Sequence, residues 1–255
     1  MSTIRLPLWI LLLTMVSWLS AGVPGKWRDG ETLDYEISWG FVSAGNAHLH
    51  VRPMPGSADK IEFISRAWNN GFFESVYPVQ DTIYTRVGAQ SLLPDVFTKT
   101  LNEGSYHQKS SIRFDRVGNK AALSDTVFND DKKRSVKRSF DSTLVLEGGE
   151  HCVMSAFYLV RTMDLKPGQT TYFSAVSGKK RYPLKVICHR REKISTVLGD
   201  RDCLVVEPML DGDGIFKSKG RLTIWLTNDD KRIPVKMKTE ITLGSVVAEL
   251  TAYSP

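Results

Sequence analysis

The sequence predicts an all-β protein, mainly antiparallel, in which a curved sheet or barrel-like sandwich of many short strands carries one short helix. Two observations support this fold class. Apolar and polar residues alternate with a period of two through most of the chain, which places one face of each strand in the core and the other in water. One stretch alone has the three-to-four spacing that is typical of an amphipathic helix.

The clearest strand pattern lies in residues 220–253. Three alternating runs are separated by turns at residues 228–231 and 243–245, where Asn, Asp and Gly tolerate the backbone angles of tight turns. These runs predict an antiparallel meander with one apolar face. The apolar positions are Leu222, Ile224 and Leu226 in the first run, Ile233, Val235, Met237 and Ile241 in the second, and Val246, Ala248, Leu250 and Ala252 in the third.

The same alternation predicts the other strands in chain order. The aromatic stretch 72–78 is predicted to be a connection at the edge of the sheet. Residues 129–138, the most polar stretch, are predicted to be an exposed loop, and residues 199–202 a hairpin turn. The predicted strands are 33–39, 44–51, 61–68, 79–87, 96–101, 105–114 and 120–128, followed later in the chain by 170–176, 181–188, 193–198 and 203–207.

The predicted helix covers residues 151–163. Val153, Phe157 and Val160 form its apolar stripe, with Arg161 on the flank, and Pro167 follows its end. A single helix among many strands has to pack on a sheet or plug an opening. It also divides the chain into two possible halves, residues 23–145 and 164–255, of what we expect to be one β-rich domain.

The N-terminus has the form of a secretory signal peptide. Arg5 provides a short basic region, residues 6–19 are apolar with few breaks, and residues 20–22 are small, as a cleavage site requires. We therefore expect residues 1–22 to be removed and residues 23–255 to be exported to the periplasm. The alternative is an uncleaved anchor, although the apolar run is shorter than the ~20 residues that span a bilayer. No later run is long enough for a transmembrane segment.

Three cysteines are present, and an exported protein folds in a compartment where disulfides form. Cys188 and Cys203 lie near the ends of neighbouring predicted strands, so they are the candidate disulfide, which leaves Cys152 free. The alternative is that all three are buried small hydrophobic side chains.

The chain is basic, with 34 Lys and Arg against 28 Asp and Glu. Arg5 is the one charged residue among the first 22, so the formal charge of +6 becomes +5 after cleavage. In the cell envelope the available polyanions are lipid headgroups and cell-surface polymers, so we expect no nucleic-acid partner. The alternative is that the basic clusters are solvated strand faces and loop tips.

Chemical motifs are absent from the sequence. No Gly-x-Ser-x-Gly elbow occurs, and Cys152 next to His151 is adjacency in sequence alone. His48 and His50 share a strand face but alternate with apolar residues, which favours a polar strand face over a metal site. The segment 211–214 lacks the later ligands of a calcium loop. We expect no catalytic residues, no metal and no cofactor.

A curved sheet with an apolar face must cover that face or leave a cavity for an apolar ligand. The alternative for each candidate side chain is a place in the ordinary core. The candidates to line a cavity are Trp39, Phe41, Trp68, Phe72, Phe73, Phe157 and Trp225. The candidates to contact an anionic head group are Lys179, Lys180, Arg181, Arg190 and Arg191.

Several segments together resemble a known family. They are Gly30-Glu31 with Leu33 and Tyr35, Ala44-Gly45 with Ala47, Tyr158-Leu159-Val160-Arg161, Gly199 with Val205 and Pro208, Ile224-Trp225-Leu226-Thr227 with Asp230, Arg232-Ile233-Pro234-Val235, and Gly244-Ser245. The chain is similar over nearly its whole mature length to the bacterial exported domain of unknown function 3108. The resemblance implies an exported envelope protein of Gram-negative type with a β-rich, barrel-like fold, and it implies no catalytic residues.

The sequence therefore predicts a non-enzymatic envelope protein that holds a hydrophobic or amphipathic, lipid-like ligand. Two alternatives remain open. The first is an envelope assembly factor that pairs a strand edge with a protein partner and binds no small molecule. The second, less favoured, is a hydrolase whose site is assembled from several strands.

Overall fold

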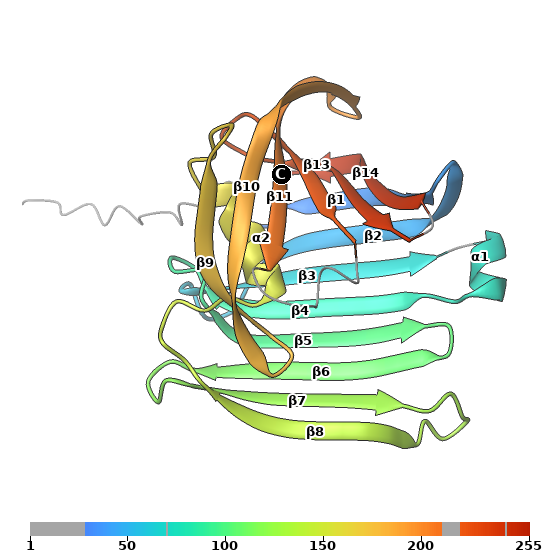
Figure 1. Cartoon of the computed structure of the whole chain (residues 1–255), viewed down its shortest axis with the longest axis vertical. Coiled ribbons are helices and arrows are strands. Elements are labelled where there is room, and N and C mark those ends of the chain that lie inside the picture. The colour runs from blue at the N-terminus through green and yellow to red at the C-terminus, as the bar shows by residue number, and fades with distance from the viewer. Residues whose placement is uncertain (1–28, 70, 211–219, 243) are drawn as a thin grey trace, which may run out of the picture.

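The computed structural model describes residues 29–69, 71–210, 220–242 and 244–255, so the predicted signal peptide and the segment 211–214 lie outside the described residues. Within the described ranges, fourteen antiparallel strands form one curved, unclosed sheet, and two helices accompany it (Figure 1). The all-β, antiparallel fold predicted from the sequence is confirmed.

The strands are β1 (Thr32–Trp39), β2 (Val42–Pro53), β3 (Lys60–Asn69), β4 (Gln80–Gly88), β5 (Pro94–Glu103), β6 (Tyr106–Asp115), β7 (Lys120–Phe128), β8 (Val136–Val145), β9 (Thr170–Ser177), β10 (Lys180–Thr196), β11 (Gly199–Leu210), β12 (Leu222–Thr227), β13 (Pro234–Ile241) and β14 (Gly244–Ser254). The helices are α1 (Gly71–Val76) and α2 (Val153–Thr162).

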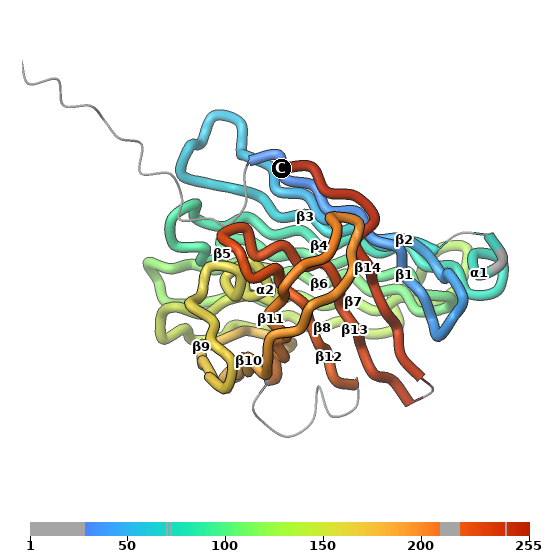
Figure 2. Tube along the Cα trace, turned by 90° about the horizontal axis from the view of Figure 1, so that it is seen from above, coloured from blue at the N-terminus to red at the C-terminus, as the bar shows by residue number. Residues whose placement is uncertain are grey.

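Two meanders make up the sheet, whose order is β8-β7-β6-β5-β4-β3-β2-β1-β14-β13-β12-β11-β10-β9. The first strand pairs with the last, since β1 runs antiparallel to β14 from Thr32 opposite Ser254 to Trp39 opposite Val246. Helix α2 lies between the meanders in the chain and also in space, because the sheet curves so that its two halves form layers on either side of the helix (Figure 2).

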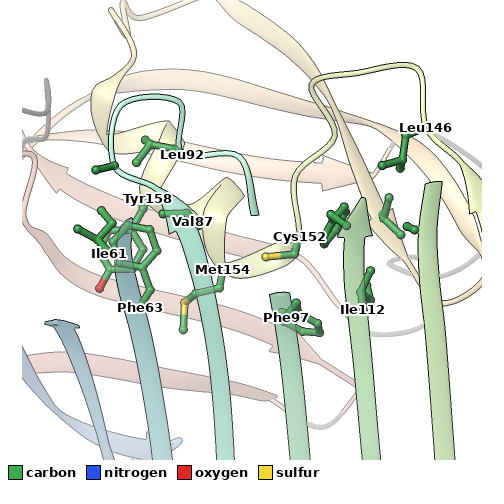
Figure 3. Close-up of a cluster of buried hydrophobic side chains, with 14 of the residues drawn as sticks. Ile61, Phe63, Val87, Leu92, Phe97, Ile112, Leu146, Cys152, Met154 and Tyr158 are labelled. Carbon is green, nitrogen blue, oxygen red and sulfur yellow. The ribbon is translucent and has the colours of Figure 1, made fainter. Parts of the chain in front are cut away.

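The core lies where α2 packs between these layers. Met154 and Tyr158 of α2 pack on strands of the first meander, among them Phe63 of β3 and Phe97 of β5 (Figure 3). Ala156 and Val160 face the second meander. Phe157 packs against all three hydrophobic clusters of the described protein, so the helix that the sequence predicted is the element that joins the two halves.

The structure corrects three details of the predicted elements. Strand β8 includes part of the predicted loop 129–138; its backbone pairs with β7 although most of its side chains are exposed. Strand β10 is a single 17-residue strand where two were predicted, because a bulge between Cys188 and Arg190 absorbs the break in polarity. The aromatic connection contains the short helix α1, so the described chain has two helices and not one.

The predicted disulfide between Cys188 and Cys203 is wrong in this structure, where all three cysteines are buried free thiols. Cys188 lies opposite Val206, whereas Cys203 lies opposite Glu192 further along the ladder. Positions 203 and 206 are three residues apart on β11, which corresponds to about 10 Å along the strand. A disulfide requires Cα atoms within about 7 Å of each other, so the register excludes it.

Burial also keeps these two thiols protonated. It is the main cause that raises the pKa of Cys188 and that raises the pKa of Cys203 to about 11. Both therefore act as small apolar side chains, which is the alternative that the sequence left open.

Candidate functional site

An apolar hollow lies on the concave face of the sheet, beside the N-terminal half of α2. It consists of two adjoining cavities of about 90 and about 310 Å³. Val153, Phe157 and Leu222 line both cavities, so the two adjoin along these side chains, and we call them together the α2 hollow. The smaller cavity is also lined by Ala156, Val160, Leu184, Pro208, Ile224 and Leu226, and the larger by Ile37, Ala47, Leu49, Ser65, Ile83, Met154, Met237, Thr239, Val246 and Ala248.

The strand period explains why the lining is apolar. Leu222 and Ile224 alternate along β12, and the register brings Met237 of β13 opposite Ile224 and beside Ala248 of β14. Their side chains therefore share one face of the sheet. This is the meander face that the sequence predicted to be apolar.

Small side chains explain why the space is not filled. Ala248 pairs with Ile37, and Ala47 pairs with Tyr35 at the middle of the sheet, so two alanines stand where larger side chains could reach the helix. The helix also leaves space on its side of the hollow, because Val153, the first residue of α2, is 54% exposed. The hollow is therefore a product of residue size at a few positions.

A polar cavity of about 180 Å³ adjoins the hollow at Val153. Phe97 and Phe140 form part of its lining, and most of the polar side chains that line it come from β5, β6 and β7. Asp125 accepts hydrogen bonds from Gln108 Nε2 at 2.5 Å and from Ser110 Oγ at 2.6 Å, and Lys99 lies in the same wall. The concave face thus changes from apolar to polar around the start of α2, as a site for an amphipathic molecule would.

A buried ion pair fixes the C-terminal end of α2. Arg161 donates from both terminal nitrogens to the carboxylate of Glu31, at 2.6 and 2.9 Å, and neither side chain is exposed. It also donates to the carbonyl oxygens of Arg232 and Lys231, each at 3.1 Å. One guanidinium therefore links the helix, the start of β1 and the β12–β13 turn.

Two tyrosines surround this pair. Tyr35 donates to the carbonyl oxygen of Pro234 at 2.7 Å, and Tyr158 lies with its ring 5.4 Å from the Arg161 guanidinium carbon. Burial raises the pKa of both phenols, so both remain neutral. Burial would lower the pKa of Arg161, but the hydrogen bonds and charge of Glu31 outweigh it and the pKa is raised.

A second buried carboxylate fixes the entry to α2. Glu150 accepts from the backbone N–H groups of Glu147 and Gly148, and Arg116 and Arg181 lie 3.6 and 3.7 Å from its oxygens. Next to it, Cys152 caps the helix in a reciprocal arrangement with Ser155. Both ends of the helix beside the hollow are therefore held by charged groups from other elements.

His151, beside this carboxylate, gives a testable pH dependence. Its pKa is lowered to about 4, first because burial disfavours the imidazolium and second because the Arg116 charge repels it, against a smaller opposing effect of Glu150. In the unfolded chain the pKa is near 6.5. Stability from this group is full above about pH 6.5 and is lost as the pH falls towards 4, by roughly 3 kcal/mol.

The measurement is the urea-unfolding free energy of the parent and of His151→Gln at pH 7.5, 6 and 5. We expect the parent to lose stability relative to the variant as the pH falls. Burial raises the pKa of Asp81 to about 6, so protonation of Asp81 makes the folded state more stable as the pH falls. Asp81 is present in both proteins, so its effect cancels in the comparison. Parallel curves for the two proteins would contradict the assignment.

The predicted lining residues are spread over the molecule. Phe157 lines both cavities. Trp225 lies opposite Lys236 and packs with Cys203 and Val205, whereas its neighbours Ile224 and Leu226 face α2. Trp68 alternates with Ala67 of the core cluster and faces away from the helix. Trp39, Phe41 and Phe73 lie at the opposite end of the strands from α2, and the side chain of Phe72 lies outside the described residues.

The predicted anionic-head residues do not form one cluster. Lys180 and Arg181 begin β10, whereas Arg190 and Arg191 follow about ten residues later, roughly 30 Å along the strand. Arg181, Arg190 and Arg191 each have an acidic neighbour, namely Glu147, Glu192 and Asp202. Lys179 lies 4.0 Å from the ring of Phe140 and thus beside the polar cavity.

The sequence reasoning missed the groups that hold α2 in place. The apolar spacing predicts Arg161 on the flank of the helix, and it predicts no role for Glu31 or Glu150. The sequence contains one signal of the buried ion pair. Arg161, four residues after Phe157, falls on the apolar stripe of the helix. A charge within an apolar stripe indicates a buried partner, although its identity cannot be read from spacing.

Metal binding finds no support in the described residues, which contain no group of three or more His, Cys, Asp or Glu that could hold an ion. His48 instead contacts Asp34, with 2.6 Å between Nδ1 and Oδ1. In the described part of the chain, neither helix has the length or apolar content needed to cross a bilayer.

The sequence matches the family described as a protein of unknown function, DUF3108, over residues 34–251. A β-barrel-like protein of Brucella abortus, from the domain of unknown function DUF1849, has a similar structure with a TM-score of 0.55. It is 10% identical, and the match covers 89% of this chain and 97% of that one, which shows a shared fold. A Bacteroides fragilis protein with a YmcC-like fold matches with a TM-score of 0.37 at 9% identity, over 89% of this chain and 97% of its own. No curated protein matches the sequence.

Proposed function

The chain belongs to the DUF3108 family of proteins of unknown function, so its activity has to be argued from the site, and we propose that it binds the apolar chain of a lipid-like molecule in the α2 hollow. The observation that carries this proposal is the apolar lining of the two adjoining cavities, which share Val153, Phe157 and Leu222.

The size and the lining of the hollow suit an apolar chain. Ligand sites in proteins commonly enclose about 300–1,000 Å³, and the larger cavity reaches the lower end of that range. An apolar cavity of about 150 Å³ stays dry and accepts a benzene-sized molecule. Transferring each methylene of an acyl chain from water into such a lining is favourable by about 0.8 kcal/mol.

The adjoining polar cavity supports an amphipathic ligand. With the chain in the hollow, a head group near Val153 would meet the ammonium of Lys99, whereas the hydroxyl of Ser110 already donates to Asp125. Lys179, beside Phe140 in the same wall, adds positive charge. We therefore expect a carboxylate or phosphate head group in preference to a cationic one.

The predicted export signal supports a location in the periplasm, where such a protein would hold lipid-like molecules away from water. This role requires no covalent bond to be made or broken. The polar groups of the site have the residue types of a binding site, and Asp125 is already engaged by Gln108 and Ser110.

The experiment is a titration of residues 23–255, which contain every described element, with a fluorescent fatty acid. Val153→Trp should weaken binding at least about tenfold, because the larger side chain projects from the helix into all three cavities. Ala248→Phe should do the same from the sheet side. Val197→Trp is the matched control, since Val197 has the same exposed fraction, 54%, and lies in the β10–β11 turn.

Circular dichroism of each variant would establish that the fold is intact. Absence of binding by the folded parent, or equal binding by the parent and both cavity variants, would contradict the proposal. Organic extraction of the protein purified from its native envelope, followed by mass spectrometry, would identify the natural ligand.

A second role is favoured by the edge of the sheet. In the described residues β8 pairs with β7 alone, so its other edge can accept a strand from an envelope partner. Lys137 and Arg138 on this strand are the kind of charged residues that discourage unselective pairing. A folded protein that binds no fatty acid but is captured by one envelope protein through β8 would favour this alternative.

A further inference from the structure

Exposed apolar side chains gather at the tips of two hairpins. Phe41, in the β1–β2 turn, has 108% relative exposure, so its whole ring stands in solvent. Three further large apolar side chains around it are also exposed. We define the tip patch as Trp39, Phe41, Val42 and Ile241.

The two hairpins lie side by side. Trp39 of β1 pairs with Val246 of β14, and the N–H of Gly40 donates to the carbonyl oxygen of Ser245 at 3.2 Å. The β1–β2 and β13–β14 tips therefore form one projecting edge at the end of the sheet that also carries α1 (Figures 1 and 2). At this end α1 and the residue after it add the exposed side chains of Val76 and Tyr77.

The tips have no charged residue in sequence. None occurs in residues 37–47 or in residues 241–248. The first charges on either side are Glu36 and Arg52 for the first segment and Glu240 and Glu249 for the second. The β7–β8 loop has the opposite composition, with five charged residues in succession at 130–134. Surface turns are usually polar, so an uncharged aromatic edge indicates a partner that is itself apolar.

The tip patch lies next to the α2 hollow along β1 and β13. Ile37, Thr239 and Val246 line the larger cavity. Trp39 follows Ile37 by two residues on β1, and Ile241 follows Thr239 by two on β13, so each shares a strand face with a lining residue. The patch and the hollow therefore lie on the same face of the sheet.

We propose that the tip patch inserts into the interfacial layer of a lipid bilayer. A protein partner would need about 800 Å² of complementary surface on each side, which two narrow projecting turns do not offer. A bilayer deforms around a projection, and aromatic side chains favour its interface. Because the tips are uncharged, the attachment depends on apolar burial and not on the charge of the lipid.

The test is flotation of residues 23–255 with vesicles of phosphatidylcholine alone and of phosphatidylcholine mixed with phosphatidylglycerol. The parent should float with both at low and at high salt. Phe41→Asp should lower the bound fraction at least about tenfold, since it replaces the most exposed side chain of the tip patch with a charge. Phe41→Leu should bind nearly as the parent does.

The matched control is Val117→Asp, which adds the same charge in the β6–β7 turn, away from the tip patch, where Val117 is 96% exposed. It should float as the parent does. A folded parent that stays with the unbound fraction would overturn the inference, and so would equal flotation of Phe41→Asp. Binding limited to anionic vesicles and abolished by salt would also overturn it, because the basic clusters would then be responsible.

This inference stands apart from the proposed ligand site. Phe41 lines neither cavity, so Phe41→Asp should keep the parent's affinity for the fluorescent fatty acid. If the parent binds no fatty acid yet loses flotation with Phe41→Asp, the ligand site is refuted and the membrane contact is supported. The reverse result, fatty acid bound and no flotation, refutes the membrane contact alone.

Discussion

Replacing Arg161 with alanine is expected to lower the free energy of unfolding by about 3–5 kcal/mol, because it leaves the carboxylate of Glu31 buried without its partner. The two side chains have no exposed surface, and the guanidinium also satisfies the carbonyl oxygens of Arg232 and Lys231. The measurement is urea unfolding followed by circular dichroism.

Two comparisons make this expectation specific. Arg190→Ala removes an arginine from the exposed pair with Glu192, and it should cost less than about 1 kcal/mol. The double variant Glu31→Leu with Arg161→Met removes both charges, and it should recover most of the lost stability, since a well-packed apolar pair avoids the desolvation of two ions. Equal losses for Arg161→Ala and Arg190→Ala would show that the buried pair is not a major support of the fold.

Replacing Phe63 with alanine is expected to cost about 3–5 kcal/mol, the range for deleting a buried phenyl ring. Phe63 has no exposed surface and stacks on Tyr158, with ring centroids 3.7 Å apart and planes at 7°. Because Phe63 lies on β3 and Tyr158 on α2, the stack attaches the helix to the first meander (Figure 3).

Phe41→Ala is the control for this second experiment, since it deletes the same ring at a fully exposed position. It should change the unfolding free energy by no more than about 0.5 kcal/mol. A loss at Phe63 no larger than that at Phe41 would mean that the space under the helix collapses on truncation. The two variants also separate stability from function, because Phe41 belongs to the tip patch and Phe63 to the core.

These attachments bear on how the hollow works. Arg161 holds one end of α2, Glu150 holds the segment before the other end, and the Phe63 stack holds the middle. A helix fixed at three places keeps the space beside it formed without a ligand, which lowers the entropic cost of binding. We therefore expect ligands to enter along the strands from the tip patch and not by displacement of the helix.

The sequence could predict the elements whose periodicity is strong. The alternation at Leu222, Ile224 and Leu226 identified the face that lines the hollow, and the spacing of Val153, Phe157 and Val160 located α2 to within two residues at its start. These patterns are local, because the side of a strand or helix that a residue occupies depends on its immediate neighbours in the chain.

Other features escaped local reasoning for identifiable causes. β8 has a polar, mostly exposed sequence, so its strand form follows from backbone pairing with β7 and not from burial. Trp68 and Trp225 are large and apolar, which suggested a cavity lining, but their strand parity directs them away from α2. The register of β10 against β11 likewise separated Cys188 from Cys203.

The sequence by itself therefore determined the all-β class, the central helix and the apolar face of the last meander, since each is encoded in the spacing of residues a few positions apart. The tertiary structure alone decided the ion pair of Arg161 with Glu31, 130 residues away, the pairing of β1 with β14, and the hollow left between Ala47, Ala248 and the helix. Such features depend on which distant segments meet and on how completely their side chains fill the space between them, and neither is encoded in local spacing.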